Sequence, residues 1–157
     1  MQNDNWGRQN NNNSREQDRN KPVNYEAQPF VININRAARQ NKNFRTEIWT
    51  GKFLQVTLMS IPVGGEIGIE IHPSLDQFLR LEEGRGVVKM GKDKSNMNFQ
   101  RLVDRNSAIM IPADTWHNLI NTGNVPIKLY SIYAPPAHPV GTVHRTKTES
   151  DAAEERH

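Results

Sequence analysis

The stretch Gly64-Gly65-Glu66-Ile67-Gly68-Ile69-Glu70-Ile71-His72 decides the fold, because small or polar residues alternate in it with isoleucine. Strict alternation of this kind is typical of a β-strand. It therefore predicts a strand over 66–72. One face of that strand carries Glu66, Gly68, Glu70 and His72, and the other carries Ile67, Ile69 and Ile71. On this interpretation Glu70 and His72 point the same way.

Short alternating segments of the same kind recur along the chain with turn residues between them, which predicts an all-β sandwich or barrel. A single helix is expected over Arg36–Lys42. The other expected strands are Phe30–Asn35, Arg45–Thr50, Phe53–Ile61, Gln77–Glu82, Gly86–Met90, Met97–Val103, Ala108–Ile111, His117–Asn121 and Ile127–Tyr133.

The length of 157 residues corresponds to one domain. Only 35% of the residues are hydrophobic, below the ~45–50% of compact proteins, so part of the chain is expected to lie outside a packed core. Residues 1–26 are rich in Asn and Gln, which predicts a disordered arm. We expect a domain over 27–140 and a flexible, irregular tail over 141–157.

Composition also excludes several classes of function. The chain has no cysteine, which removes disulfides, thiolate nucleophiles and Cys-ligated metals. The formal net charge is +3 and the excess of basic residues is spread along the chain, so we expect no nucleic-acid partner. No apolar run is long enough to span a membrane, and the first residues lack a signal peptide. We therefore expect a soluble, cytoplasmic protein without a membrane partner.

Four side chains form a candidate metal site. Glu70 and His72 share a strand face, Gln77 opens the next predicted strand, and His117 stands at the start of a later one. Two imidazoles, a carboxylate and an amide oxygen are plausible metal ligands if the fold brings them together.

The spacing of these residues resembles the two sequence motifs of the cupin superfamily. In the first motif, G-x5-H-x-H-x(3,4)-E-x6-G, Glu70 stands at the first His and Gln77 at the Glu. In the second, G-x5-P-x-G-x2-H-x3-N, Asn106 and Asp114 replace the two glycines. These replacements are mild because Asn and Asp tolerate a left-handed backbone. The remaining motif positions match at Gly64, His72, Gly84, Pro112, His117 and Asn121.

The resemblance, which covers roughly residues 27–140, implies a single cupin domain, an RmlC-like jelly-roll β-barrel. The run Gly65–His72 and the segment Ala134-Pro135-Pro136 look like a group of small bacterial cupins often labelled mannose-6-phosphate isomerase-like. The resemblance also implies that Glu70, His72, Gln77 and His117 hold a divalent first-row metal ion. Its identity stays open between Fe, Mn, Ni and Zn.

The expected function is binding of, or metal-dependent chemistry on, a small organic molecule. An oxygenase, a sugar or sugar-phosphate isomerase, and a non-catalytic metabolite-binding or structural cupin all remain open. The inward-facing set contains no cationic residue to hold a phosphate, which lowers the isomerase option. No separate general base is identifiable. His138 and His144 lie in the proline-rich tail, where a solvent-facing role is favoured over a lid or proton shuttle.

Two further expectations follow from alternation. Leu79, Leu81 and Leu119 are predicted to point inward, which gives a mostly apolar pocket around the metal. The three isoleucines of the first motif are predicted to form an apolar stripe on the outside of the barrel. Such a stripe needs a cover, and we expect a homodimer to supply it, with the strand Phe30–Asn35 as the alternative.

Overall fold

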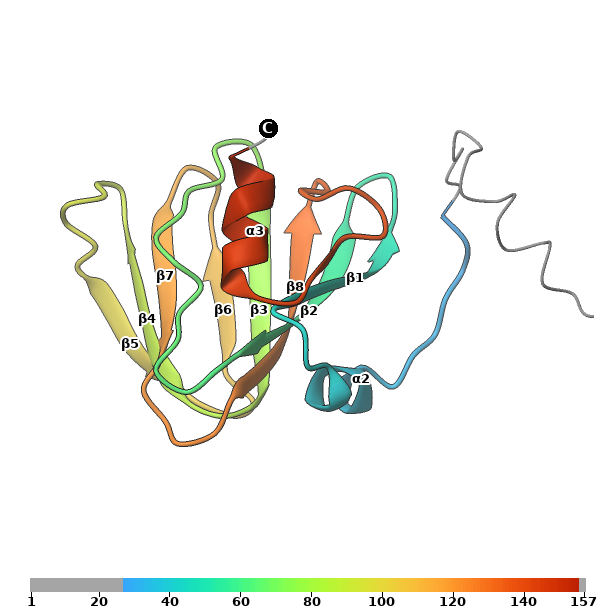
Figure 1. Cartoon of the computed structure of the whole chain (residues 1–157). Helices are drawn as coiled ribbons and strands as arrows, with labels where there is room; N and C mark the ends of the chain where they lie inside the picture. The colour runs from blue at the N-terminus through green and yellow to red at the C-terminus, as the bar shows by residue number, and fades with distance from the viewer. Residues whose placement is uncertain (1–26, 156–157) are drawn as a thin grey trace, which may run out of the picture.

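The computed structural model describes residues 27–155 and shows two β-sheets that face each other (Figure 1). The predicted disordered arm, residues 1–26, lies outside the described residues. The helices are α2 (Ile34–Gln40) and α3 (Lys147–Glu154). The strands are β1 (Arg45–Thr50), β2 (Gln55–Ile61), β3 (Asp76–Glu83), β4 (Gly86–Gly91), β5 (Phe99–Val103), β6 (Ala108–Ile111), β7 (Trp116–Asn121), β8 (Ile127–Ala134) and β9 (Val143–His144).

The larger sheet has the strand order β6-β3-β8-β2-β1-β9, and the smaller one has the order β5-β4-β7. All strand pairs in the two sheets are antiparallel. Alternate residues of β2, β3 and β8 point inward and meet residues of β4 and β7. This arrangement confirms the predicted all-β jelly-roll fold. The core between the sheets includes Met59, Leu79, Leu81, Leu129, Val88 and Leu119.

The segment 66–72 is not a regular strand, which corrects the prediction made from its alternating pattern. It meets β7 only through two isolated bridges, Glu66 with Ile120 and Glu70 with His117. The physical reason lies at Gly68, whose φ of +99° is outside the range that L residues adopt in a strand. The chain turns there, so the side-chain alternation does not continue across Gly68.

This turn removes the predicted apolar stripe. Ile67 is only 6% exposed and belongs to the core, whereas Ile69 is 47% exposed and Ile71 lines a pocket. The three isoleucines therefore do not share an outer face. The homodimer predicted from that stripe loses this support.

The segment Phe30–Asn35 is also not a strand. Residues 27–33 have no regular structure, and helix α2 begins at Ile34. Asn33 caps this helix, since its side chain accepts a hydrogen bond from the Arg36 N–H. The alternation of this segment predicts a strand, but the capping asparagine decides the outcome.

The two motif positions where glycine is replaced adopt the left-handed backbone. Asn106 has a φ of 75° and Asp114 a φ of 60°, and they are the non-glycine residues with positive φ in the described part of the chain. Both turns therefore form without glycine, as the sequence comparison with the motifs predicts.

Residues 135–155, called the cap below, contain regular structure, unlike the irregular tail expected over 141–157. Strand β9 pairs with β1, and helix α3 begins after Thr146, whose hydroxyl accepts a hydrogen bond from the Glu149 N–H.

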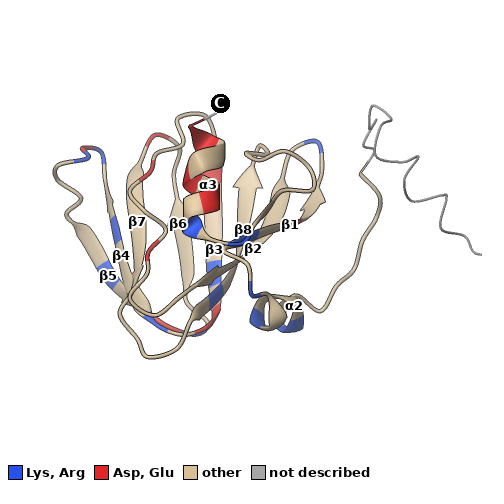
Figure 2. Cartoon of the chain, in the orientation of Figure 1, with Lys and Arg blue, Asp and Glu red and all other residues tan. Residues whose placement is uncertain are grey.

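Acidic residues lie on α3 and basic residues on α2, while other charges are scattered over the strands and loops (Figure 2). Within residues 27–155 no helix has the length and apolar character to cross a membrane.

Candidate metal centre

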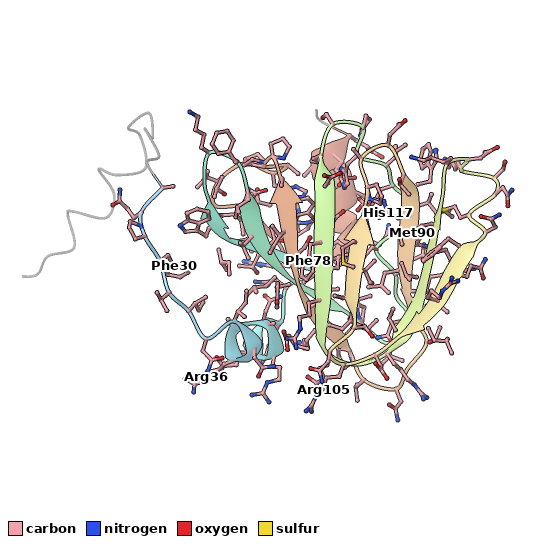
Figure 3. All side chains as sticks on the ribbon, turned by 180° about the vertical axis from the view of Figure 1, so that it is seen from behind. Phe30, Arg36, Phe78, Met90, Arg105 and His117 are labelled. Carbon is pink, nitrogen blue, oxygen red and sulfur yellow. The ribbon has the colours of Figure 1, made fainter. Side chains whose placement is uncertain are left out.

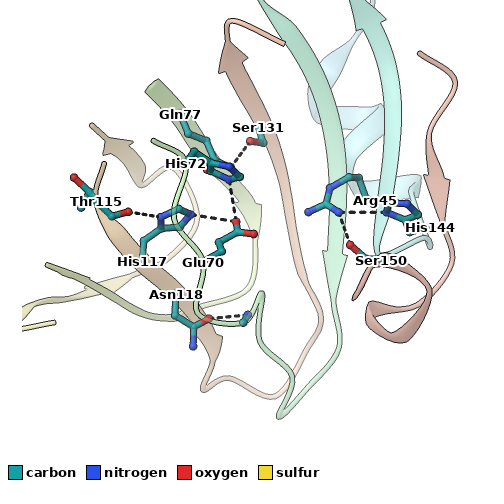
Figure 4. A network of polar contacts seen from close by, with 11 residues as sticks. Arg45, Glu70, His72, Gln77, Thr115, His117, Asn118, Ser131, His144 and Ser150 are labelled. Carbon is teal, nitrogen blue, oxygen red and sulfur yellow. Dashed lines mark hydrogen bonds and ion pairs between the residues drawn. The ribbon is translucent and has the colours of Figure 1, made fainter. Parts of the chain in front are cut away.

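Glu70, His72 and His117, called the triad below, converge at one end of the space between the sheets (Figure 4). One ligand atom from each residue lies within 4.8 Å of the other two. The Nε2 atoms of His117 and His72 lie 3.1 Å and 3.4 Å from Oε1 of Glu70. The structure therefore brings together three of the four side chains predicted from the sequence.

The backbone holds two triad members opposite each other. The Glu70 N–H donates to the His117 carbonyl and the His117 N–H donates to the Glu70 carbonyl, both at 3.0 Å. Two residues before Glu70, the Gly68 N–H donates to the Asn118 side-chain oxygen at 2.9 Å. The turn at Gly68 thus places Ile67 in the core and Glu70 in the site at the same time.

The tautomer of His117 follows from its second hydrogen bond. Its Nδ1 lies 2.9 Å from the Thr115 carbonyl oxygen. A carbonyl only accepts, so Nδ1 carries a proton and, in the neutral ring, Nε2 carries a lone pair. That lone pair faces a carboxylate oxygen of Glu70, an arrangement that is favourable only with a proton or a cation between them.

The electrostatics of Glu70 agree with this arrangement. Burial on its own raises the pKa of Glu70, but the His117 and His72 rings beside its carboxylate hold that pKa well below its usual range. Glu70 is therefore ionised at neutral pH. A negative oxygen with two imidazole nitrogens around it is the donor set of many divalent metal sites.

The two distances from Glu70 Oε1 to the imidazole nitrogens fit a bound ion. Ligands about 2.0–2.1 Å from a tetrahedral zinc lie roughly 3.3 Å from one another, close to the 3.1 Å and 3.4 Å found here. In addition, the buried Nε2 of His72 has no hydrogen-bond partner among residues 27–155. A buried nitrogen without a partner is unfavourable unless something else binds it.

Gln77, on β3, is drawn next to His72 in Figure 4 and is 4% exposed. Its Nε2 donates to the Ser131 hydroxyl at 3.0 Å, while its buried Oε1 has no hydrogen-bond partner in the described part of the chain. This orientation leaves the amide oxygen available as a further donor atom.

A pocket of about 600 Å³ lies above Glu70 and His72. Leu79, Leu81 and Leu119 point inward as predicted, but they are fully buried in the core and do not line this pocket. The prediction that they form the pocket wall is therefore wrong. The cap supplies the other walls. Its lining residues there are Pro136, Ala137, His138, Pro139, Thr142, His144, Ala153 and Glu154.

His138 and His144 are thus pocket residues, contrary to the solvent-facing role expected for them. Gln55 fixes the backbone of His138, because its amide donates to the His138 carbonyl at 2.7 Å and accepts from the His138 N–H at 2.9 Å. Burial lowers the pKa of His138 to about 3, so its ring is neutral at neutral pH.

The cap is joined to the barrel by Arg45, a residue that the sequence reasoning missed. Arg45 is 2% exposed, and its Nη1 donates to the Ser150 hydroxyl at 2.5 Å and lies 3.2 Å from Nδ1 of His144. Because a guanidinium only donates, Nδ1 of His144 accepts this bond. The motif Thr146-x-x-Glu149, a helix N-terminal signature, was the sequence signal for α3.

Comparison with known proteins assigns the family. The Cupin domain family matches residues 57–133, the region that contains the triad and Gln77. The chain belongs to the cupin superfamily. This cupin is 66% identical over 131 residues to the uncharacterized protein YrkC of Bacillus subtilis, an alignment that covers 83% of this chain and 70% of YrkC.

Solved structures agree with the cupin fold. The crystal structure of BH2720 from Bacillus halodurans is 62% identical, has a TM-score of 0.79, and aligns with 80% of this chain and 95% of its own. The crystal structure of TT1209 from Thermus thermophilus is 22% identical and has a TM-score of 0.57. The alignment covers 67% of this chain and 96% of the TT1209 chain. At this identity the likeness shows the fold alone. The narrower resemblance to the mannose-6-phosphate isomerase-like group is not supported by these relatives.

Proposed function

We propose that this cupin binds a divalent first-row metal ion through Glu70, His72 and His117 and holds a small organic molecule in the pocket above it. The observation that carries the proposal is the convergence of two imidazole nitrogens on one ionised carboxylate oxygen. The Thr115 carbonyl, which keeps the proton of His117 on the opposite ring nitrogen, supports it.

Gln77 is proposed as a weaker fourth ligand or as a hydrogen-bond donor next to the ion. Its amide oxygen is buried and free of other partners among the described residues, and Ser131 holds the other end of the amide. Fe, Mn, Ni and Zn all accept nitrogen and carboxylate donors. A bound ion of this kind supplies Lewis-acid polarisation of a ligand oxygen, or redox chemistry if it is iron.

The pocket residues give the chain its own part in binding the molecule. His138 is neutral at neutral pH and its buried Nε2 has no hydrogen-bond partner within residues 27–155. We propose that it accepts a hydrogen bond from the bound molecule. The prolines and alanines of the cap give the pocket apolar walls beside that molecule.

The pocket lining favours a small molecule without a phosphate group. None of its lining residues is Lys or Arg, and Glu154 stands on its wall. A sugar phosphate therefore lacks the cationic partners that it needs. An oxygenase and a non-catalytic binding protein both fit, and oxygen uptake by the iron-loaded protein in the presence of small organic acids, sugars and phenols separates the two.

Metal analysis tests the site directly. The protein is purified without a metal-affinity step, and metal content is compared in the wild type, His72→Ala, His117→Ala and His144→Ala. The last variant is a matched control, because His144 shares the pocket but not the triad. Stoichiometric metal in the wild type and the control, lost in the two triad variants, is expected. Equal trace metal in all four proteins contradicts the proposal.

The contribution of Gln77 is tested against that of Glu70. Gln77→Ala is expected to weaken metal binding less than Glu70→Ala, because a neutral amide attracts a dication less strongly than a carboxylate does. Equilibrium dialysis with a fluorescent chelator as competitor measures both dissociation constants. Equal losses in the two variants contradict the ranking.

A further inference from the structure

A second cavity, called the basic pocket below, lies between the cap and the barrel. Its volume is about 440 Å³, a size that suits a small organic molecule. The chain that follows α2, the end of β2, the start of β8 and the first turn of α3 form its walls. None of its lining residues lines the pocket above the triad.

The walls of the basic pocket carry an excess of positive charge. Its lining contains four cationic residues, Lys42, Lys128, Arg145 and Lys147, and a single carboxylate, that of Glu66. The whole chain has a formal net charge of only +3, so this one cavity carries as much excess positive charge as the chain does. The lining of the pocket above the triad contains neither Lys nor Arg. The two cavities therefore suit molecules of different charge.

Most of this charge has no anionic partner among the described residues. Of the four cations only Lys147 forms an ion pair within residues 27–155, with Asp151 at 2.7 Å. The side chains of Lys42 and Arg145 are exposed and form no hydrogen bond or ion pair in the same part of the chain. Unpaired cations on the walls of one cavity attract an anion.

Lys128 is held in the wall of the basic pocket by neutral groups. Its ammonium group donates to the Asn41 carbonyl at 2.6 Å and to the Ser60 hydroxyl at 3.0 Å. An ammonium group has three donors, so one N–H is left for a ligand. Burial lowers the pKa of Lys128, Glu83 opposes this effect, and the charge of Lys42 adds to it. An anion between the two ammonium groups relieves their repulsion.

Apolar side chains complete the lining of the basic pocket. Phe44 is 4% exposed, and Pro62 and Pro126 add further apolar surface. The Phe44 N–H donates to the Arg145 carbonyl at 3.1 Å, which joins the barrel to the cap at this point. Cationic and apolar groups on the same walls suit an anion that carries an apolar body.

Helix α3 extends from the basic pocket to the pocket above the triad. Its first residue, Lys147, lines the basic pocket, and its last residues, Ala153 and Glu154, line the other one. At 1.5 Å per residue the helix is ~12 Å long, and in Figure 1 it runs from the side of α2 to the C-terminus. Figure 3 shows the two ends from behind, with Arg36 of α2 at the lower end and His117 in the upper half. A molecule in the basic pocket therefore contacts the cap at a distance from the triad.

We propose that the basic pocket binds a small organic phosphate and that the bound molecule holds the cap against the barrel. A phosphate group carries about −1.5 to −2 charges at neutral pH, which balances most of the excess charge of the cavity. Lys42 and Lys128 contact this group from the barrel side and Arg145 contacts it from the cap, so the phosphate bridges the two parts. The apolar body of the molecule lies against Phe44 and the two prolines. Binding needs no metal ion.

Titration of the isotope-labelled protein, followed by its amide NMR signals, tests the proposal. The protein is first freed of metal and of chelator by dialysis. Phenyl phosphate is expected to shift the signals of residues 42–44 and 145–147 in a saturable way and to leave those of residues 70–72 unchanged. It is expected to bind roughly tenfold or more tightly than inorganic phosphate, which lacks the apolar body, and than benzoate, which carries a smaller charge.

Charge-reversal variants locate the binding site. Lys42→Glu/Arg145→Glu is expected to weaken phenyl phosphate binding roughly tenfold or more, because two attractive charges become repulsive. Lys52→Glu/Lys92→Glu is the matched control, since it makes the same change of charge at exposed residues in the β1–β2 and β4–β5 turns. Its affinity is expected to stay within about twofold of the wild type, because salt screens distant surface charges. His72→Ala is also expected to keep the affinity. Thermal unfolding confirms that each variant is folded.

Hydrogen exchange tests whether the bound molecule holds the cap. Phenyl phosphate is expected to slow amide exchange in α3 of the wild type but not in α3 of Lys42→Glu/Arg145→Glu. Unchanged exchange in the wild type overturns the bridging role. The binding site itself is overturned by equal affinity in the wild type and the pocket variant, by the absence of saturable binding, or by loss of binding in His72→Ala alone. Benzoate or inorganic phosphate that binds as tightly as phenyl phosphate overturns the assignment to an organic phosphate.

Discussion

Replacing Ile67 and Ile69 separately by alanine tests the turn on which the site depends. Ile67 is 6% exposed in the core, and Ile69 is 47% exposed on the surface. The Ile67→Ala change removes three buried carbons, which is about 2.4 kcal/mol of transfer free energy at ~0.8 kcal/mol for each. The cavity that remains raises the loss of unfolding free energy to roughly 2.5–5 kcal/mol. Ile69→Ala is expected to change it by about 0.5 kcal/mol or less.

Urea unfolding of the metal-free protein in the presence of a chelator measures both values. The expected signature of Ile67→Ala is a lower midpoint with an unchanged slope, because the cavity affects stability and not the surface exposed on unfolding. The midpoint temperature of thermal unfolding of Ile67→Ala is expected to fall by roughly 5–15 °C. Ile69→Ala keeps both values close to the wild type.

Equal losses in the two variants refute the reasoning. They indicate that both isoleucines share one face, as the alternating sequence on its own predicts, and that the chain continues through Gly68 as a strand. In that case the position assigned to Glu70 loses its structural basis as well.

Three other predictions follow from the same region. Gly68→Ala is expected to lower the unfolding free energy by about 1–3 kcal/mol and to weaken metal binding, because φ at Gly68 is +99° next to Glu70. Gly64→Ala is the control, because Gly64 also has a positive φ, of +75°, and there is open space around the added carbon. This control is expected to leave metal affinity unchanged. Equal metal affinity in the two variants contradicts the role assigned to the turn at Gly68. His138 has a pKa lowered to about 3 in the folded protein. When the protein unfolds at a pH below 6.5, the ordinary pKa of histidine, this ring therefore takes up a proton. The stability that it contributes is therefore fully present above pH 6.5 and falls as the pH drops toward 3, with a slope below ~1.4 kcal/mol per pH unit. His138→Gln removes this slope in urea titrations, and an unchanged slope contradicts the assignment. Zinc at about 100 times its dissociation constant is expected to raise the unfolding free energy of the wild type by ~2.7 kcal/mol. The same zinc concentration is expected to raise that of His117→Ala by much less. Equal increases in the two proteins contradict the proposal that His117 is a metal ligand.

The sequence predicts most of the barrel because strand periodicity and turn residues are local signals. β1 and β6 have the predicted bounds, and the other predicted strands from β2 to β8 differ by one or two residues at their ends. Motif spacing identifies Glu70, His72 and His117 for a different reason, since the number of residues between turns and strands determines which side chains reach the same end of the barrel. Asn106 and Asp114 replace glycine without loss of either turn.

The wrong predictions arise where a single residue changes the path of the chain. Alternation over Glu66–His72 carries no sign that Gly68 adopts positive φ, and glycine is equally compatible with a strand. The segment Phe30–Asn35 also alternates, but Asn33 caps a helix that begins at the next residue. In the cap, proline content and charge predict an irregular tail, whereas Thr146 caps helix α3.

The motif residues form the proposed metal site, and the cap supplies most of the walls of the pocket beside it. Motif residues lie on the barrel, whereas His138, His144 and Glu154 come from residues 135–155 and face the same pocket. Arg45 holds this cap through Ser150 and His144, although it is a barrel residue outside both motifs. Most of the residues that shape this pocket therefore lie outside the two motifs. For this reason the chemistry of the ligand has to be sought in variants of the cap, with the metal site left intact.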